Sequence, residues 1–140
     1  MRYNTTGGGE TSVSSCFQST LPLTFPGYNA VNTNFGQQNT VDEEVYVCPG
    51  TTLSLTQCSG GGSYDAATPT QLRLYDEGGT ELAAAEYSCG NGAEITHTFT
   101  APCQTYTLSQ GCEGADACMG TTAIVVQGKL DKLFIGSKLF

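Results

Sequence analysis

The chain has 140 residues, of which 39% are hydrophobic and 18 are glycine, and its formal net charge is −8 at pH 7. This length suits one domain with a hydrophobic core, and many glycines without any tryptophan suit an all-β domain rich in turns. Three of the five basic residues fall in the last twelve positions, so the acidic body has no basic stripe. Nucleic acid and anionic membrane surfaces are therefore excluded as partners, because both require clustered Lys and Arg.

Residues 1–40 are expected to form an irregular N-terminal part. The opening MRYNTTGGGE has no apolar segment typical of a signal peptide, so we expect a mature or excised form if the protein is secreted. Asn4 begins an Asn-Thr-Thr triplet, the acceptor pattern for N-glycosylation. A first strand is expected at residues 12–17. Residues 21–40 contain two prolines with several Asn and Gln, which indicates a loop or an irregular edge segment.

Two alternating segments, EVYVC and TTLSLTQC, follow with a Pro-Gly turn between them. Apolar residues at every second position between turn residues predict β-strands. The side chains expected to point inward are Val45, Val47, Leu53 and Leu55, and those expected to point outward are Ser54 and Thr56.

Five more strands are predicted between residues 71 and 127. Residues 71–87 form a hairpin around an Asp-Glu-Gly-Gly turn, with Leu72 and Leu74 inward. Residues 93–100 alternate again, and residues 105–108 and 121–127 complete a set of about eight strands. This spacing predicts an antiparallel, jelly-roll-like β-sandwich formed as a single domain by residues 1–128.

The last stretch, GKLDKLFIGSKLF, is basic and hydrophobic, unlike the body of the chain. One interpretation is a final strand followed by linker residues. The other is a docking segment that buries its apolar residues on a neighbouring subunit as an added strand or an amphipathic turn. The candidate contact residues in this tail, residues 129–140, are Leu130, Leu133, Phe134, Ile135, Leu139 and Phe140. No segment has the roughly 18 continuous apolar residues of a membrane helix, so no membrane insertion is expected.

Seven cysteines are spread along the chain without any Cys-x₂-Cys pair, and the chain has one histidine. Zinc sites use close cysteine pairs or matched histidines, so a disulfide framework in an oxidising compartment is the better interpretation. Loop length and turn position suggest three pairs and one cysteine that is unpaired or intermolecular. The expected pairs are Cys58–Cys89, Cys112–Cys118 and Cys48–Cys103, which leaves Cys16.

From residue 45 onward the motifs VYVCPGTTLSL, LRLYDEGGTELA, YSCGNGAEITHTFTAPCQTYTL and TTAIVV occur in an order that resembles the bacterial pre-peptidase C-terminal (PPC) domain. The resemblance covers residues 41–128, the PPC-like part. It implies a jelly-roll-like sandwich with a non-catalytic accessory role. Some members of that family bind Ca²⁺ through acidic loop residues, and the many cysteines and His97 depart from the family pattern.

No catalytic residue is assigned. His97 is the sole general-base candidate, but it shares an apolar strand face with Ile95 and Phe99, where a packed histidine is the commoner case. Calcium is the sharper alternative, because it prefers carboxylate oxygens. The candidates for that site are Asp42, Glu43, Glu44, Asp65 and Asp76. Glu113 and Asp116 lie inside the loop closed by Cys112 and Cys118 and have no assigned role.

Glycan binding would need exposed aromatic side chains, for which Tyr28 and Tyr64 are the candidates. Taken together, the residues predict a non-catalytic extracellular structural or adhesion module without a cofactor, located in the secreted space or on the cell surface. It would be a subunit or repeat of a larger assembly, joined to other protein subunits or to copies of itself through strand edges and the tail. The alternative is a glycan- or calcium-binding accessory module of a secreted protein.

Overall fold

The computed structural model describes residues 23–127, 133–135 and 138–139. The predicted strand at residues 12–17, the sequon at Asn4 and the odd cysteine Cys16 lie outside these residues. In the described part the chain is all-β, and every strand pairing is antiparallel. No helix in the described residues is long and apolar enough to cross a membrane.

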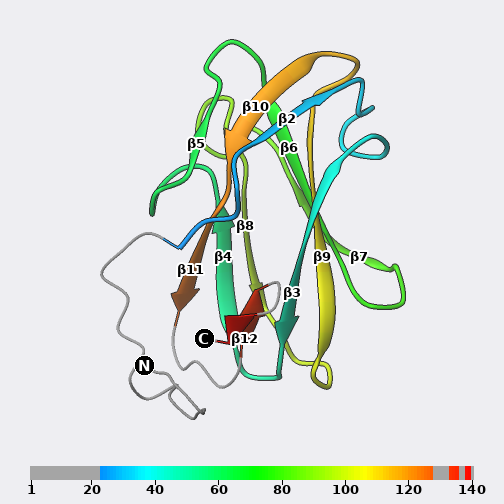
Figure 1. The fold of residues 1–140 in the computed structure, drawn as a ribbon, viewed down its shortest axis with the longest axis vertical. Coiled ribbons are helices and arrows are strands. Elements are labelled where there is room, and N and C mark those ends of the chain that lie inside the picture. Colours follow the sequence, from blue (N-terminus) through cyan, green and yellow to red (C-terminus); the bar gives the residue numbers. More distant parts are fainter. Residues whose placement is uncertain (1–22, 128–132, 136–137, 140) are drawn as a thin grey trace.

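The strands form three sheets. The largest has the order β13-β12-β3-β9-β6-β7, the second β11-β4-β8, and the third β2-β10-β5. Figure 1 shows the first two facing each other and the third at one end of the molecule. The largest sheet comprises β3 (Val41–Val47), β6 (Thr70–Tyr75), β7 (Glu81–Ala85), β9 (Gln104–Cys112), β12 (Leu133–Ile135) and β13 (Lys138–Leu139). The second sheet comprises β4 (Thr52–Thr56), β8 (Glu94–Thr98) and β11 (Ala123–Gln127). The third sheet comprises β2 (Tyr28–Val31), β5 (Ser63–Tyr64) and β10 (Ala117–Thr121).

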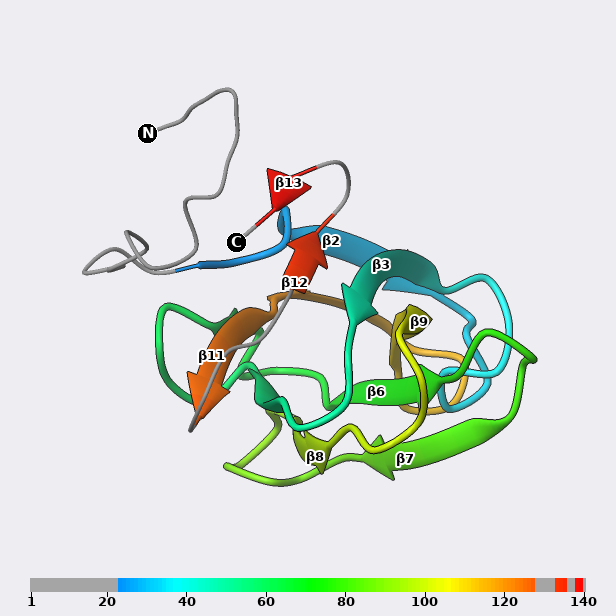
Figure 2. The same ribbon diagram turned by 90° about the horizontal axis from the view of Figure 1, so that it is seen from below.

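One apolar cluster fills the space between the two larger sheets, which gives a sandwich-like arrangement. It takes residues from β3, β6 and β9 on one side and from β4, β8 and β11 on the other (Figure 2). The inward positions predicted from alternation are confirmed, since each of them is at most 1% exposed: Val45, Val47, Leu53, Leu55, Leu72 and Leu74. Burial of such side chains supplies most of the stabilisation of a fold of this size.

Ser54 and Thr56 point outward as predicted, but they are buried there, with exposures of 3% and 1%. They do lie on the face of β4 opposite the core, but there they take part in a ladder of side-chain hydrogen bonds. The Ser54 hydroxyl lies 2.8 Å from that of Thr96 and accepts a bond from the Gln127 amide at 2.6 Å. A central strand buries both of its faces, which alternation along one strand does not reveal.

Several strands occur where loops were expected. β2 arises in the segment expected to be a loop, β5 is a two-residue strand outside the predicted strands, and β10 begins inside the loop that Cys112 and Cys118 close. Between β2 and β3 the chain turns through left-handed residues, among them Asn32, Asn34 and Asn39 with φ between 51° and 55°. Asparagine tolerates this conformation better than most residues, which explains the asparagines that had suggested an irregular segment.

The structure contains the three expected disulfides, Cys48–Cys103, Cys58–Cys89 and Cys112–Cys118. The first joins the turn after β3 to the loop before β9, and the second joins the end of β4 to the turn before β8. The third connects the end of β9 to β10. Three intramolecular disulfides are consistent with an oxidising environment outside the cytosol.

Candidate functional site: the β3 edge and the acidic sheet face

The tail adds a strand to the body of its own chain at β3. β3 pairs with β9 along its whole length on one side, from Val41 opposite Gln110 to Val47 opposite Gln104. On its other side it pairs with β12, with Leu133 opposite Val47 and Ile135 opposite Val45. Both interpretations of the tail included an added strand, either in the same chain or on a neighbouring subunit. The structure shows the strand added within one chain (Figure 1).

The backbone places four of the six predicted contact residues in this added hairpin. Leu133, Phe134 and Ile135 make up β12, and Leu139 belongs to β13, which pairs back on β12. Leu130 and Phe140 lie outside the described residues.

The alternating sequence of β3 separates its acidic side chains between two environments. Asp42 and Glu44 are exposed on the outer face of the largest sheet. Glu43 is half-buried on the inward side, beside the core position Leu108. Burial, followed by the nearby charge of Asp42, raises the pKa of the Glu43 carboxyl above its usual value.

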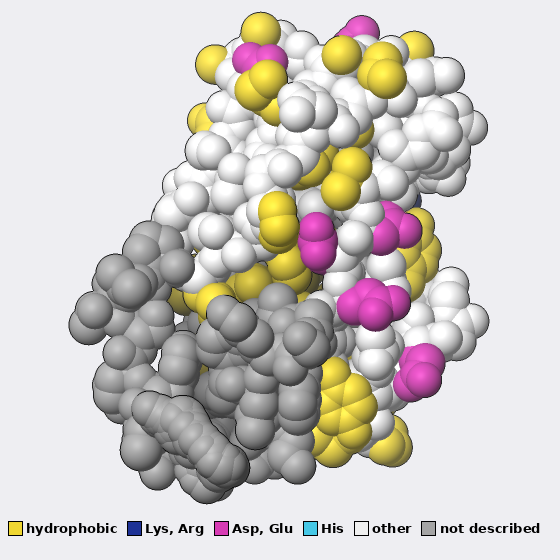
Figure 3. Space-filling view, in the orientation of Figure 1, with side chains coloured by type: hydrophobic (Ala, Val, Ile, Leu, Met, Phe, Trp, Pro, Cys, Tyr) yellow, Lys and Arg dark blue, Asp and Glu magenta, His cyan; other side chains and the backbone are white. Residues whose placement is uncertain are grey.

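The outer face of this sheet carries rows of acidic and hydroxyl side chains. Asp42 lies opposite Ser109, and Ser109 in turn lies opposite Arg73. Arg73 is the one cation among residues 23–127, and its guanidinium donates to Glu81 and to the Phe35 carbonyl, each at 2.8 Å. That positive charge is therefore used within the fold, and acidic side chains gather over the β3 side of the face in Figure 3.

An open pocket of about 390 Å³ lies on this face. It is bounded by the left-handed turn after β2 and by the turn between β6 and β7. The polar residues around it include Asp42, Asp76, Glu77, Tyr75, Thr107 and Ser109. Such a lining offers oxygen atoms to a cation or to the hydroxyls of a sugar.

The five predicted calcium ligands do not come together. Asp42 and Asp76 line the same pocket, Glu43 lies on the inward side of β3, and Asp65 borders a different pocket beside β5 and β10. In the described part of the chain no group of three or more His, Cys, Asp or Glu residues is placed to hold a metal ion. Calcium binding by these carboxylates therefore stays a prediction, and Glu44, the fifth candidate, is exposed on the outer face of β3.

Two of these carboxylates instead stabilise turns. The Asp76 Oδ1 accepts a hydrogen bond from the Thr80 amide at 2.8 Å, which closes the hairpin turn. The Asp65 Oδ1 accepts one from the Ala67 amide at 2.9 Å. Short side-chain acceptors of this kind are the usual reason for aspartate in turns.

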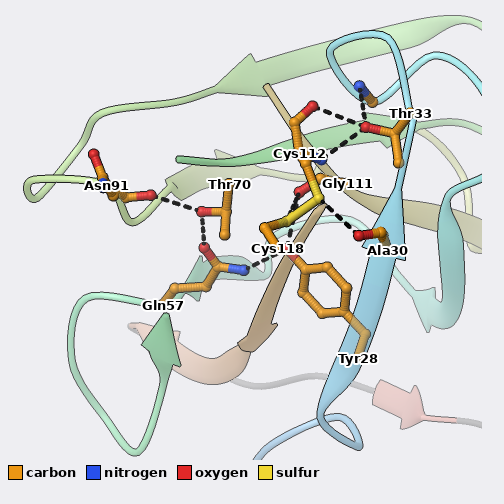
Figure 4. The surroundings of a disulfide bond; sticks show 10 residues. Tyr28, Ala30, Thr33, Gln57, Thr70, Asn91, Gly111, Cys112 and Cys118 are labelled. Carbon is orange, nitrogen blue, oxygen red and sulfur yellow. Dashed lines mark hydrogen bonds between the residues drawn. A yellow bond between two sulfur atoms is a disulfide. The ribbon is translucent and has the colours of Figure 1, made fainter. Parts of the chain in front are cut away.

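Neither tyrosine proposed for glycan binding is a free platform. Tyr28 is 3% exposed, and its hydroxyl donates to the Gly111 carbonyl at 3.0 Å (Figure 4). Burial raises the pKa of Tyr28 to about 12. Tyr64 is half-buried, with its ring against Gly92, where a Cβ atom would collide with it. The expected exposure of Tyr28 is therefore wrong, because β2 turns that side chain inward.

Glu113 and Asp116, in the loop after Cys112, take part in local hydrogen bonds. The Glu113 carboxylate accepts a 2.6 Å hydrogen bond from the Tyr87 hydroxyl, and this bond raises the pKa of Tyr87 to about 12. The backbone carbonyl of Asp116 accepts a bond from the Asn32 amide. These contacts connect the loop to β2 and to the segment after β7.

His97 packs in the sandwich as its strand face suggested. Its ring meets that of Phe99 edge to face, with centroids 4.7 Å apart, and Phe99 meets Tyr106 in the same manner at 4.6 Å. Partial burial lowers the pKa of the imidazole below its ordinary value of 6.5.

We expect the ring-proton NMR signals of His97 to titrate with a midpoint below 6.5, because burial disfavours the charged imidazolium. The unfolded chain then binds more protons than the folded one as pH falls through 6.5, so acidification in this window lowers the free energy of unfolding. The same histidine in the urea-unfolded chain is the control. A folded-state midpoint at or above the unfolded one would contradict this assignment and indicate a nearby anionic partner.

A buried polar cluster surrounds Gln57, as Figure 4 shows, and no predicted site included it. The Gln57 Oε1 accepts bonds from the Ala93 amide at 3.1 Å and from the Thr70 hydroxyl, and its Nε2 donates to the Tyr28 hydroxyl at 3.1 Å. The available signal was a glutamine directly after an alternating strand, which alone does not distinguish burial from exposure.

In comparison with known proteins, no family model matches the chain and no curated protein is significantly similar to it. The resemblance to the PPC domain therefore stays a prediction, as does the jelly-roll topology.

Proposed function

We propose that the chain is a non-catalytic structural or adhesion module of a secreted or cell-surface protein. In this proposal copies of it, or other protein subunits, join through strand edges and the tail. The observation that carries the proposal is the addition of β12 to the edge of β3. An edge that accepts one strand by backbone pairing is a general means of joining protein chains.

The disulfides and the acidic surface support the same proposal. Three internal disulfides suit a module that has to keep its shape outside the cytosol. Packed side chains, turns and internal hydrogen bonds account for His97, Asp65, Asp76 and Tyr28, which were candidates for chemistry or ligand binding.

A glycan- or calcium-binding role takes second place. One observation favours it, namely the pocket on the outer sheet face that brings Asp42 and Asp76 together with Tyr75 and the hydroxyl side chains of three Ser and Thr residues.

Deletion of residues 129–140 tests the proposal. The mass of the full chain in light scattering is expected to rise with protein concentration, and the shortened chain is expected to stay at the monomer mass because it lacks the added strand. Met119→Ser is the matched control, since Met119 is a 53% exposed apolar residue on a different sheet. Unchanged association after the deletion, or association lost in the control alone, would overturn assembly through the tail.

A further inference from the structure

The pairing at β3 specifies a strand and its register in detail. Phe134 lies opposite Tyr46, between the Leu133–Val47 and Ile135–Val45 pairs. Antiparallel addition relies on backbone N–H and C=O groups that alternate regularly along the edge. The acceptor edge therefore recognises the backbone and register of β12, whichever molecule β12 belongs to.

We propose that β12 and β13 of one copy pair with β3 of a second copy in this same register. The inference rests on the proposed function and names its partner and its contact. Exchange of an identical element between copies keeps the β12–β3 pairing unchanged, which makes it an easy route to association. Reciprocal exchange gives a closed dimer, and one-way exchange gives a chain of copies.

The charge distribution favours pairing of the tail of one copy with the β3 edge of another copy. Residues 23–127 hold eleven of the thirteen acidic residues, since Glu10 and Asp131 lie outside that range, and Arg73 is their one cation. Lys129, Lys132 and Lys138 all belong to the tail. Two acidic bodies repel each other, whereas a basic tail and an acidic body attract, so that encounters are oriented.

The position of the acidic residues on β3 strengthens this point. β12 pairs with residues 45–47, and the stretch Asp42-Glu43-Glu44 continues along the same strand beyond that pairing. In β13, Lys138 lies opposite Ile135, whose own partner on β3 is Val45. The register therefore places a basic position next to the acidic end of the acceptor strand.

The two ends of the exchanged segment also lie at one end of the body. β11 finishes at Gln127 opposite Thr52, and β12 starts at Leu133 opposite Val47. Val47 and Thr52 are themselves joined by the turn at residues 48–51, which carries Cys48. Copies linked by exchange are therefore expected to meet at the end of the sandwich that holds the Cys48–Cys103 disulfide.

Cysteine cross-linking between two differently tagged chains tests the exchange. One full-length chain carries Tyr46→Cys and the other Phe134→Cys, both with Cys16→Ser to remove the odd cysteine, and the two are co-expressed. Opposed residues on antiparallel strands have Cα atoms about 4.5–5.5 Å apart, within the range that a disulfide spans. The expected product is a mixed dimer joined by a disulfide between the two introduced cysteines, identified by mass spectrometry of non-reduced peptides.

A single chain with both substitutions is the control for the pairing itself, and it should close within one molecule. If the control closes and no mixed dimer forms, exchange between copies is wrong. If the wild-type chain nevertheless associates as its concentration rises, the proposed function stands, and the copies join through another surface. Absence of both the mixed dimer and the association removes both proposals.

Discussion

Replacing Cys48 and Cys103 by alanine is expected to lower the free energy of unfolding by about 4 kcal/mol, the largest loss among the three disulfides. These cysteines are 55 residues apart, compared with 31 for Cys58–Cys89 and 6 for Cys112–Cys118. A cross-link restricts the unfolded chain more strongly as the closed loop lengthens. The corresponding losses for the other two pairs are about 3.7 and about 2 kcal/mol.

Urea unfolding of the three double-alanine variants at 25 °C measures this order, with Cys16→Ser in every protein so that thiols do not reshuffle. The Cys112–Cys118 variant is the internal control, because both of its sulfurs are buried and its loop is short. If it is destabilised as much as the Cys48–Cys103 variant, loss of core packing outweighs loop closure and the predicted order is wrong.

Gln57→Leu is expected to lower the free energy of unfolding by about 3 kcal/mol, although leucine has a similar volume. Gln57 is 1% exposed, and its Oε1 accepts the hydrogen bond of the Ala93 amide. Leucine leaves that amide without this acceptor at a position from which water is excluded, since Ala93 is fully buried. The Thr70 hydroxyl keeps its hydrogen bond to the Asn91 carbonyl, and the Tyr28 hydroxyl keeps its bond to the Gly111 carbonyl. Part of the cluster therefore survives.

Gln104→Leu is the matched control. Gln104 also uses both ends of its amide, with Oε1 accepting from the Glu77 amide and Nε2 donating to the Pro102 carbonyl, each at 3.1 Å. It lies half-exposed, where water replaces the lost bonds, so its loss is expected to stay under about 1 kcal/mol. Equal losses for the two glutamines in urea unfolding would show that burial of the Gln57 cluster contributes nothing extra.

Elements with a strong local signal were predictable. Val45, Val47, Leu53 and Leu55 alternate with polar residues between turn residues, and the structure buries all four. The hairpin around residues 76–80 followed from its Asp and Gly residues, and the structure closes it through Asp76. In each case the decisive interactions lie within a few residues of one another in the sequence.

The candidate site was predictable in part. The tail was recognised by composition, and strand addition was one of the interpretations offered for it. The strand to which the tail adds was not predictable. β3 and β12 are separated by more than eighty residues, and their pairing depends on which edge of which sheet is left open. The calcium candidates do not lie together for a similar reason, since neighbours in sequence such as Asp42 and Glu43 point to opposite faces of one strand.

The order of residues was enough to predict an acidic, disulfide-linked all-β chain, the inward positions of its alternating strands and, from loop lengths and turns, the three cysteine pairs. These features depend on local periodicity, turn chemistry and charge. Long-range packing, in contrast, buries Ser54 and Tyr28, brings Gln57 into a polar cluster and adds the tail to β3. The physical reason is that burial on the second face of a strand, and the choice of an open edge, depend on which distant segments pack against it.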